Sequence, residues 1–185
     1  MPFPYPENER QRLEALARYN ILDTAAEQVF DDFTLIASAI CQTPIAVVSF
    51  VDAGRQWFKA RLGIDATETP REHAFCAYTI LGRDVMVVED ATQDERFAGN
   101  PLVTSEPNIR FYAGAPLIDS EGNALGALCV IDRIPRHLTM EQLKALEALS
   151  RQIIAHMELT LAAAGLADAL IDKSVPPEQP KGTEA

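Results

Sequence analysis

Two apolar runs joined by a short polar loop form the clearest pattern in the chain. Residues 111–118 are almost uninterrupted apolar residues, residues 119–123 are rich in turn-forming types, and residues 124–131 are apolar again. This pattern predicts an antiparallel β-hairpin. The second run is apolar at every position, so we expect a strand that is covered on both faces.

Side chains alternate between the two faces of a strand, which predicts which residues of this second run share a face. One face is expected to hold Leu125, Ala127, Cys129 and Ile131, and the other Gly126, Leu128 and Val130. Gly126 allows another group to approach the backbone closely. Two interpretations stay open: a neighbouring loop packs closely there, or the glycine lies at the floor of a small-molecule pocket.

Apolar residues at helical spacing predict helices over residues 7–20 and 26–42 and from residue 138 onward, where Thr139 and Gln142 form a capping-box pattern. Strands are predicted at residues 45–51, 55–61 and 84–89, a short helix at 72–81, and polar loops at 63–71 and 90–105. Hairpins between terminal helices indicate an α+β domain with a central antiparallel sheet. The terminal helices are expected on one face of the sheet and a loop-covered pocket on the other.

The chain divides into three predicted parts. An N-terminal helical extension is expected over residues 1–25, and the domain itself over residues 26–161, including the last helix. A helix extension and a proline-rich disordered tail are expected over residues 162–185.

Composition narrows the class of protein. With 185 residues and 48% hydrophobic residues the chain can build a substantial core, and no apolar segment approaches the length that spans a bilayer. The N-terminus lacks a basic region followed by an apolar one, so a cytoplasmic protein is expected. A net charge of −11 disfavours nucleic acid and anionic membranes as partners.

The three cysteines, Cys41, Cys76 and Cys129, are odd in number and far apart in sequence. This arrangement argues against a disulfide framework. Each cysteine has apolar neighbours, so each is expected to be a small buried hydrophobe. His73 and Cys76 are three residues apart, but no further ligand is spaced to complete a metal site, so no metal is predicted.

Local sequences in all the central elements resemble the GAF domain. The resemblance rests on residues 45–60, on residues 69–80 with Phe75, Cys76 and Tyr78, on residues 88–102, and on residues 111–116 with 126–130. It covers residues 8 to 160 and points to a bacterial subgroup often fused to histidine kinases, diguanylate cyclases or phosphodiesterases. The resemblance implies a PAS-like fold and a role in signal transduction, for example in a two-component system.

The resemblance implies that the chain functions as a non-enzymatic sensory or regulatory module. It would bind an unidentified small molecule, or it would act as an interaction module whose pocket is filled by its own side chains. GAF domains commonly dimerise through their first and last helices, so a parallel homodimer is expected, with a kinase or cyclase as possible signalling partner. No room remains after the last helix for such an enzyme, so the chain acts in trans or is a fragment of a larger sensor; Met1 and the polar tail favour a free-standing protein.

An enzyme of a different class is the alternative. Some GAF-fold proteins reduce free methionine sulfoxide, which requires an activated thiolate and a resolving partner. Cys76 and Cys129 could both line the cavity, although their surroundings do not resemble that enzyme's motifs. The Asn-Lys-Xaa-Asp signature of cyclic-nucleotide-binding GAF domains is absent, and Ala77 stands where bilin-binding domains carry histidine after the cysteine. No cofactor and no catalytic residue are therefore predicted.

Nine residues are the candidates for ligand binding: Phe58, Arg71, Phe75, Cys76, Tyr78, Phe97, Arg110, Tyr112 and Gly126. Arg71 could clamp a carboxylate or phosphate, or it could form an ion pair with Glu68 or Glu72. Tyr112 could orient a ligand through its hydroxyl, or it could be a core tyrosine bonded to a loop carbonyl.

Overall fold

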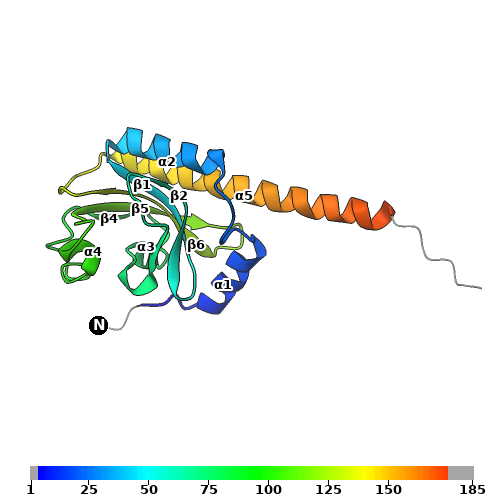
Figure 1. Ribbon diagram of the computed structural model, residues 1–185, viewed down its shortest axis with the longest axis horizontal. Helices are drawn as coiled ribbons and strands as arrows, with labels where there is room; N and C mark the ends of the chain where they lie inside the picture. The colour runs from blue at the N-terminus through cyan, green and yellow to red at the C-terminus, as the bar shows by residue number, and fades with distance from the viewer. Residues whose placement is uncertain (1–3, 175–185) are drawn as a thin grey trace, which may run out of the picture.

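The computed structural model describes residues 4–174, in which six strands form one antiparallel sheet in the order β3-β2-β1-β6-β5-β4 (Figure 1). The strands are β1 (Ile45–Val51), β2 (Arg55–Leu62), β3 (Glu68–Pro70), β4 (Met86–Val88), β5 (Phe111–Ile118) and β6 (Ala124–Asp132). The helices are α1 (Glu9–Arg18), α2 (Gln28–Cys41), α3 (Cys76–Thr79), α4 (Pro101–Thr104) and α5 (Met140–Ser174), with a 3-10 turn at Arg71–His73. All five strand pairings are antiparallel, so the predicted α+β class is confirmed.

The sheet separates two hydrophobic clusters. Helices α2 and α5 lie side by side on one face, while α3, α4 and the long loops lie on the other (Figure 1). On the helix face the core includes Phe30, Leu128 and Leu146. On the loop face it includes Phe75, Phe97 and Tyr112. The prediction of terminal helices on one face and covering loops on the other is confirmed.

Strands β1 and β6 form the centre of the sheet, and every residue in both is buried. The alternation predicted for β6 holds from Gly126 onward, because Ala127, Cys129 and Ile131 contribute to the loop-face core and Leu128 and Val130 to the helix-face core. It is wrong for Leu125, which packs on the helix face. The reason is an irregularity in the β5–β6 pairing between Leu117 and Ile118, which adds a residue and reverses the alternation.

Two short elements lie in segments predicted to be loops, β3 and α4. Helix α4 is a single turn that begins at Pro101, after Asn100 accepts a hydrogen bond from the Leu102 amide at 2.9 Å. The helix predicted over residues 72–81 is instead divided between the 3-10 turn and α3. Such single turns depend on tertiary contacts, so periodicity alone does not reveal them.

Helix α5 begins as predicted. The Gln142 amide donates to the Thr139 hydroxyl at 3.3 Å and the Thr139 amide donates to the Gln142 side chain at 2.9 Å, which is a capping box. The helix then continues well beyond the sheet (Figure 1). The tail predicted to be disordered falls largely on residues 175–185, outside the described residues. Among residues 4–174, no helix combines the length and hydrophobicity that a bilayer crossing needs.

Candidate functional site

Four central strands direct one polar or sulfur-bearing side chain each toward Cys76, the first residue of α3. The four side chains are Ser49 from β1, Gln56 from β2, Tyr112 from β5 and Cys129 from β6. Strand alternation explains their common direction: Ser49, Gln56 and Cys129 each share the loop face with a neighbour two residues away, and Tyr112 belongs to the loop-face core. The site therefore lies between the sheet and α3.

The Cys76 sulfur is surrounded by hydrogen-bond donors. The Tyr112 hydroxyl lies 3.2 Å from it, and the Ser49 hydroxyl and the Gln56 amide nitrogen each lie 3.3 Å from it. The Cys129 sulfur lies 3.8 Å away. The Thr79 hydroxyl contacts the Tyr112 hydroxyl at 2.7 Å, so Thr79 can donate to Tyr112 while Tyr112 donates to the sulfur.

This arrangement favours a thiolate at Cys76. Burial alone would raise the pKa of the Cys76 thiol, but hydrogen bonds from Cys129, Ser49, Tyr112 and Gln56 outweigh it and hold the pKa below its ordinary value. The pKa of Cys129 is raised, first by its hydrogen bond to Cys76 and then by burial. Burial and the two neighbouring sulfurs also raise the pKa of Tyr112, so that its hydroxyl keeps its proton.

A small cavity of about 30 Å³ adjoins the two sulfurs. Its walls include four of the predicted ligand-binding residues, namely Phe58, Phe75, Cys76 and Tyr112. Pockets for drug-sized ligands usually measure about 300–1,000 Å³. In this conformation the cavity therefore accepts only a molecule about the size of water.

Two other predicted residues fill the space behind this wall. The rings of Phe75 and Phe97 stack with centroids 4.0 Å apart, and the Tyr78 ring meets Phe97 edge-on at 5.0 Å. Phe75 also lies 5.1 Å from the Tyr112 ring. Four of the five aromatic candidates for ligand binding, Phe75, Tyr78, Phe97 and Tyr112, thus contact one another.

Arg71 lies at the end of the sheet, outside the group around Cys76. It is buried and forms an ion pair with Glu9 of α1, and its guanidinium also donates to the Asp52 carbonyl at 2.9 Å. The ion-pair interpretation was correct in kind, but the acidic partner is Glu9 and neither Glu68 nor Glu72. Arg71 thereby fastens α1 to the sheet.

The last two predicted residues, Arg110 and Gly126, make contacts with the backbone and not with the Cys76 side chain. Arg110 donates to the carbonyls of Val103 and Ile109, at 2.9 and 3.1 Å, and so orders the loop before β5. At Gly126 a Cβ would lie 1.9 Å from the Ser49 carbonyl oxygen of β1. The close approach that this glycine permits is therefore that of the neighbouring strand β1, so close packing is correct but the packing element is a strand and not the predicted loop, and the pocket-floor interpretation is wrong.

Sequence reasoning missed Ser49, Gln56 and Thr79 as partners of the site. The available signal was the polar residue on an otherwise apolar strand: Ser49 interrupts β1 and is fully buried. A second signal was Gly114, where a Cβ would lie 2.1 Å from the Tyr112 hydroxyl. The glycine makes room for the tyrosine hydroxyl, which bonds Thr79 and Cys76 and not the loop carbonyl considered above.

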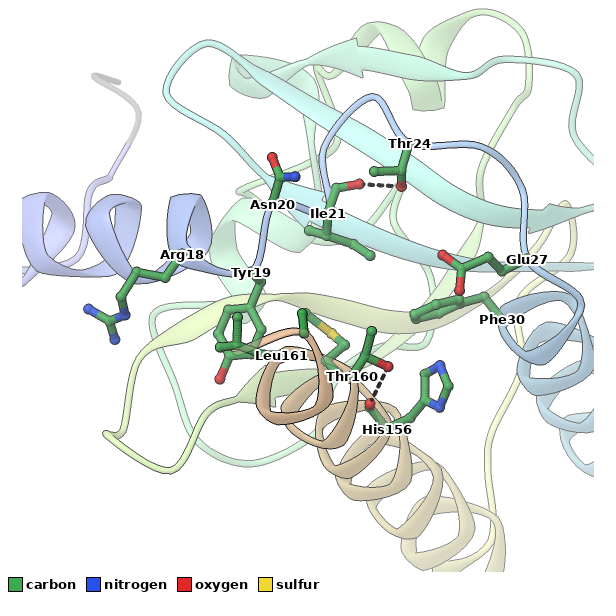
Figure 2. Close-up of a pocket in the computed structure, with 12 residues that line it drawn as sticks. Arg18, Tyr19, Asn20, Ile21, Thr24, Glu27, Phe30, His156, Thr160 and Leu161 are labelled. Carbon is green, nitrogen blue, oxygen red and sulfur yellow. Dashed lines mark hydrogen bonds between the residues drawn. The ribbon is translucent and has the colours of Figure 1, made fainter. Parts of the chain in front are cut away.

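A larger hollow of about 300 Å³ lies on the helix face, between the α1–α2 connection and α5. Figure 2 shows Tyr19, Ile21, Phe30 and Leu161 around it, with His156 at one side. The His156 ring meets Phe30 edge-on at 5.5 Å. This hollow was not predicted, because residues from both ends of the chain form it.

Within residues 4–174 no cluster of three or more His, Cys, Asp or Glu side chains is placed to hold a metal.

An antiparallel six-stranded sheet with helices on one face and a small cavity beneath loops on the other defines a domain of the α+β class. The chain belongs to the GAF domain family, whose family model matches residues 20–157. The family places it among signalling domains.

One curated relative matches most of the chain. The chain is 48% identical over 155 residues to the cyclic di-GMP phosphodiesterase PA2567 of Pseudomonas aeruginosa, a match that covers 83% of this chain and 26% of that protein. The chain thus spans about a quarter of the length of this relative.

Solved structures share the fold at low sequence identity. The GAF domain of an Acinetobacter phosphoenolpyruvate-protein phosphotransferase superposes with a TM-score of 0.61 at 15% identity, covering 84% of this chain and 96% of that one. The type II free methionine-R-sulfoxide reductase of Thermoplasma acidophilum superposes with a TM-score of 0.53 at 13% identity, covering 70% and 94%.

Proposed function

We propose that this chain is a non-enzymatic GAF sensory domain that dimerises through its terminal helices and regulates a signalling enzyme. The enzyme is a cyclic di-GMP phosphodiesterase or a kinase or cyclase, within the same polypeptide or in a separate protein. The 48% identity to one quarter of a cyclic di-GMP phosphodiesterase supports this output class. The three free thiols suit the reducing compartment in which we place it, the cytoplasm.

The observation that carries the proposal is the apolar line along α5 beyond the sheet. Leu159, Leu166 and Leu170 are 71%, 64% and 62% exposed. Together with the exposed Ala163 they are spaced by four, three and four residues, which is the repeat of a coiled coil. A parallel partner helix would bury this line.

Helix α2 offers a second apolar surface. Leu35, Ile36 and Ile40 are 57%, 43% and 38% exposed, and α2 packs against α5. A dimer interface that covers both helices would extend from the part of the domain where α2 and α5 lie on the sheet to the part of α5 that projects beyond it. A change at the loop face could then reach α5 through the sheet on which both helices rest.

Sedimentation and native mass spectrometry of the full chain test the proposal. We expect a dimer, and a monomer after Leu159→Glu combined with Leu166→Glu. The matched control is Thr160→Glu with Ala167→Glu, which adds the same charges one position off the apolar line and should leave the dimer intact. A wild-type chain that stays monomeric at high micromolar concentration would refute dimerisation.

A second candidate function is reduction of free methionine sulfoxide, favoured by the paired thiols of Cys76 and Cys129. The cavity beside them is far too small for an amino acid in this conformation. Reductant-dependent turnover of methionine sulfoxide that disappears in Cys76→Ser would establish this function. Native mass spectra of freshly purified chain, which also reveal any trapped small molecule, separate a ligand sensor from a module whose pocket is filled.

A further inference from the structure

We propose that Cys76 and Cys129 form a peroxide-oxidisable thiol pair, with Cys76 as the attacking sulfur and Cys129 as the resolving one. The inference concerns the loop face and does not depend on whether the helices dimerise. It assigns to the domain a modification site and a chemical class of reactant, a small hydroperoxide.

Position supports the pairing. Both side chains are fully buried, come from α3 and β6, and have their sulfurs 3.8 Å apart. A disulfide has an S–S distance of about 2.0 Å, so the sulfurs must approach by roughly 1.8 Å. Cys129 lies in a central strand that pairs on both sides, whereas α3 is a single helical turn between loops. The movement therefore falls on α3.

The donors around Cys76 distinguish the two sulfurs. Tyr112, Ser49 and Gln56 all direct donors at Cys76, which stabilises a thiolate there. The Ser49 hydroxyl also lies 3.4 Å from the Ala127 carbonyl, so its single proton serves either the carbonyl or the sulfur. Thiolate formation draws that proton to Cys76. The raised pKa of Cys129 keeps its thiol protonated until the resolving step.

Access to Cys76 suits a small reactant. The cavity of about 30 Å³ beside the sulfurs is bounded by Phe58, Ile64 and Leu102, and hydrogen peroxide is little larger than water. Bulky hydroperoxides do not fit. The same apolar walls keep larger thiols, such as glutathione, away from the first oxidation product.

The chemistry balances with the peroxide as oxidant. The Cys76 thiolate attacks one peroxide oxygen, so an S–O bond forms, the O–O bond breaks, and the departing hydroxide takes up a proton as water. Cys129 then loses its proton and attacks the Cys76 sulfenic acid. The S–S bond forms, the S–O bond breaks, and the departing hydroxide takes up that proton as a second water. The Cys76–Cys129 pair supplies two electrons and two protons in total.

Oxidation would alter the loop face. A disulfide removes the thiolate that Tyr112, Ser49 and Gln56 surround, and it draws α3 toward the sheet. Because Thr79 of α3 bonds the Tyr112 hydroxyl, the movement also disturbs that contact. Oxidation of the Cys76–Cys129 pair would thus change the position of α3 and of the loops beside it.

The test is hydrogen peroxide treatment of the full chain, followed by alkylation after unfolding and mass analysis. Before alkylation, the oxidised wild-type chain should be lighter than the reduced chain by two hydrogen atoms. After alkylation, only Cys41 should carry the alkyl group, and digestion should give peptides linked through Cys76 and Cys129. Cys41 is the matched control, since burial raises its pKa to about 11 and it packs in the helix-face core. Cys41→Ser should oxidise like wild type.

Two cysteine variants assign the roles. Cys129→Ser should stop at a Cys76 sulfenic acid that dimedone captures, and Cys76→Ser should leave Cys129 reduced over the same time. Oxidation of Cys41 as fast as Cys76, or a Cys76 that stays reduced while methionines oxidise, would overturn the proposal. Equal rates with hydrogen peroxide and tert-butyl hydroperoxide would contradict reaction through the cavity.

Tyr112→Phe keeps the ring and removes one donor, so it tests the activation of Cys76 without altering either sulfur. Loss of this donor should raise the Cys76 pKa, lower the thiolate fraction and slow oxidation about tenfold. A thermal melt confirms that each variant is folded. A folded Tyr112→Phe that oxidises at the wild-type rate would show that the donors do not activate Cys76.

Discussion

Glu9 of α1 lies between two buried guanidiniums, and its ion pair with Arg71 joins residues 62 positions apart in the chain. Its other partner is Arg12, whose side chain donates to both Glu9 carboxylate oxygens at 2.9 Å. Arg12 and Arg71 also donate to the carbonyls of Val51 and Asp52, at 2.7 and 2.9 Å. One carboxylate thus connects the first helix to the end of β1.

Glu9→Gln should destabilise the folded chain at neutral pH. Burial alone would raise the Glu9 pKa, but the hydrogen bonds from Arg12 and Arg71 outweigh it and lower the pKa from 4.5 to about 2. A depressed carboxyl pKa contributes stability that is present above pH 4.5 and is lost as the pH falls toward 2. Urea unfolding at pH 7 should show a loss of about 2–3 kcal/mol in the variant.

The pH dependence provides the control for this prediction. Wild type and Glu9→Gln should converge in stability as the pH falls from 4.5 to 2, since protonation removes the same charge from wild type. Glu7→Gln, on the exposed segment just before α1, should stay within about 0.5 kcal/mol of wild type at pH 7. A constant difference between wild type and Glu9→Gln across this pH range would contradict the ion-pair account.

Gly126→Ala should be strongly destabilising. The added methyl would lie 1.9 Å from the Ser49 carbonyl oxygen and 2.8 Å from the Phe50 Cα, and both atoms belong to the central strand β1. The strands must separate, at a cost of about 3 kcal/mol or more. Gly165→Ala is the matched control, because nothing lies within 4 Å of its added Cβ and it lies within α5. That variant should be more stable by about 0.5–1 kcal/mol.

The central strands could be predicted from sequence because their signal is local. Residues 45–51 and 111–118 are apolar and rich in strand-forming types, and the structure places β1 and β5 there with the predicted bounds. Alternation also correctly grouped Cys129 with Ala127 and Ile131 on one face, which in the structure is the loop face. The error at Leu125 arose from a pairing irregularity, which depends on the partner strand and has no local signal.

The candidate site could be predicted only in part, because its contacts join distant elements. Aromatic residues near Cys76 were recognised, but the donors Ser49 and Gln56 lie 27 and 20 positions before the cysteine on separate strands. Glu9 as partner of Arg71 was missed for the same reason. The sequence predicts which face a strand residue occupies, whereas the order of strands decides which residues meet there.

Thr139→Ala should weaken the start of α5. The Thr139 hydroxyl accepts from the Gln142 amide at 3.3 Å, and loss of such a cap costs about 1 kcal/mol. Thr160→Ala is the control, since its hydroxyl donates to the His156 carbonyl inside the same helix and caps nothing. Urea unfolding should place the control within about 0.5 kcal/mol of wild type. Equal losses in the two variants would show that the capping box does not stabilise the helix.

Phe75→Ala should convert the filled loop face into a ligand-sized cavity. The ring stacks on Phe97 at 4.0 Å and forms part of the wall of the 30 Å³ cavity, so its removal should cost about 3–5 kcal/mol and enlarge that space. An apolar cavity of this kind stays dry and binds benzene. Benzene should therefore raise the melting temperature of Phe75→Ala while leaving wild type unchanged.

The control for this cavity experiment is Phe33→Ala on α2, which removes a partly buried ring from the helix face and should show no benzene effect. If benzene stabilises wild type as much as Phe75→Ala, the loop face already opens to ligands in solution. The filled conformation would then be only one of its states, and the domain would sense a larger molecule. If only Phe75→Ala responds, the wild-type site does not open to a molecule the size of benzene, because Phe75 and the rings stacked behind it occupy the space that such a ligand would need.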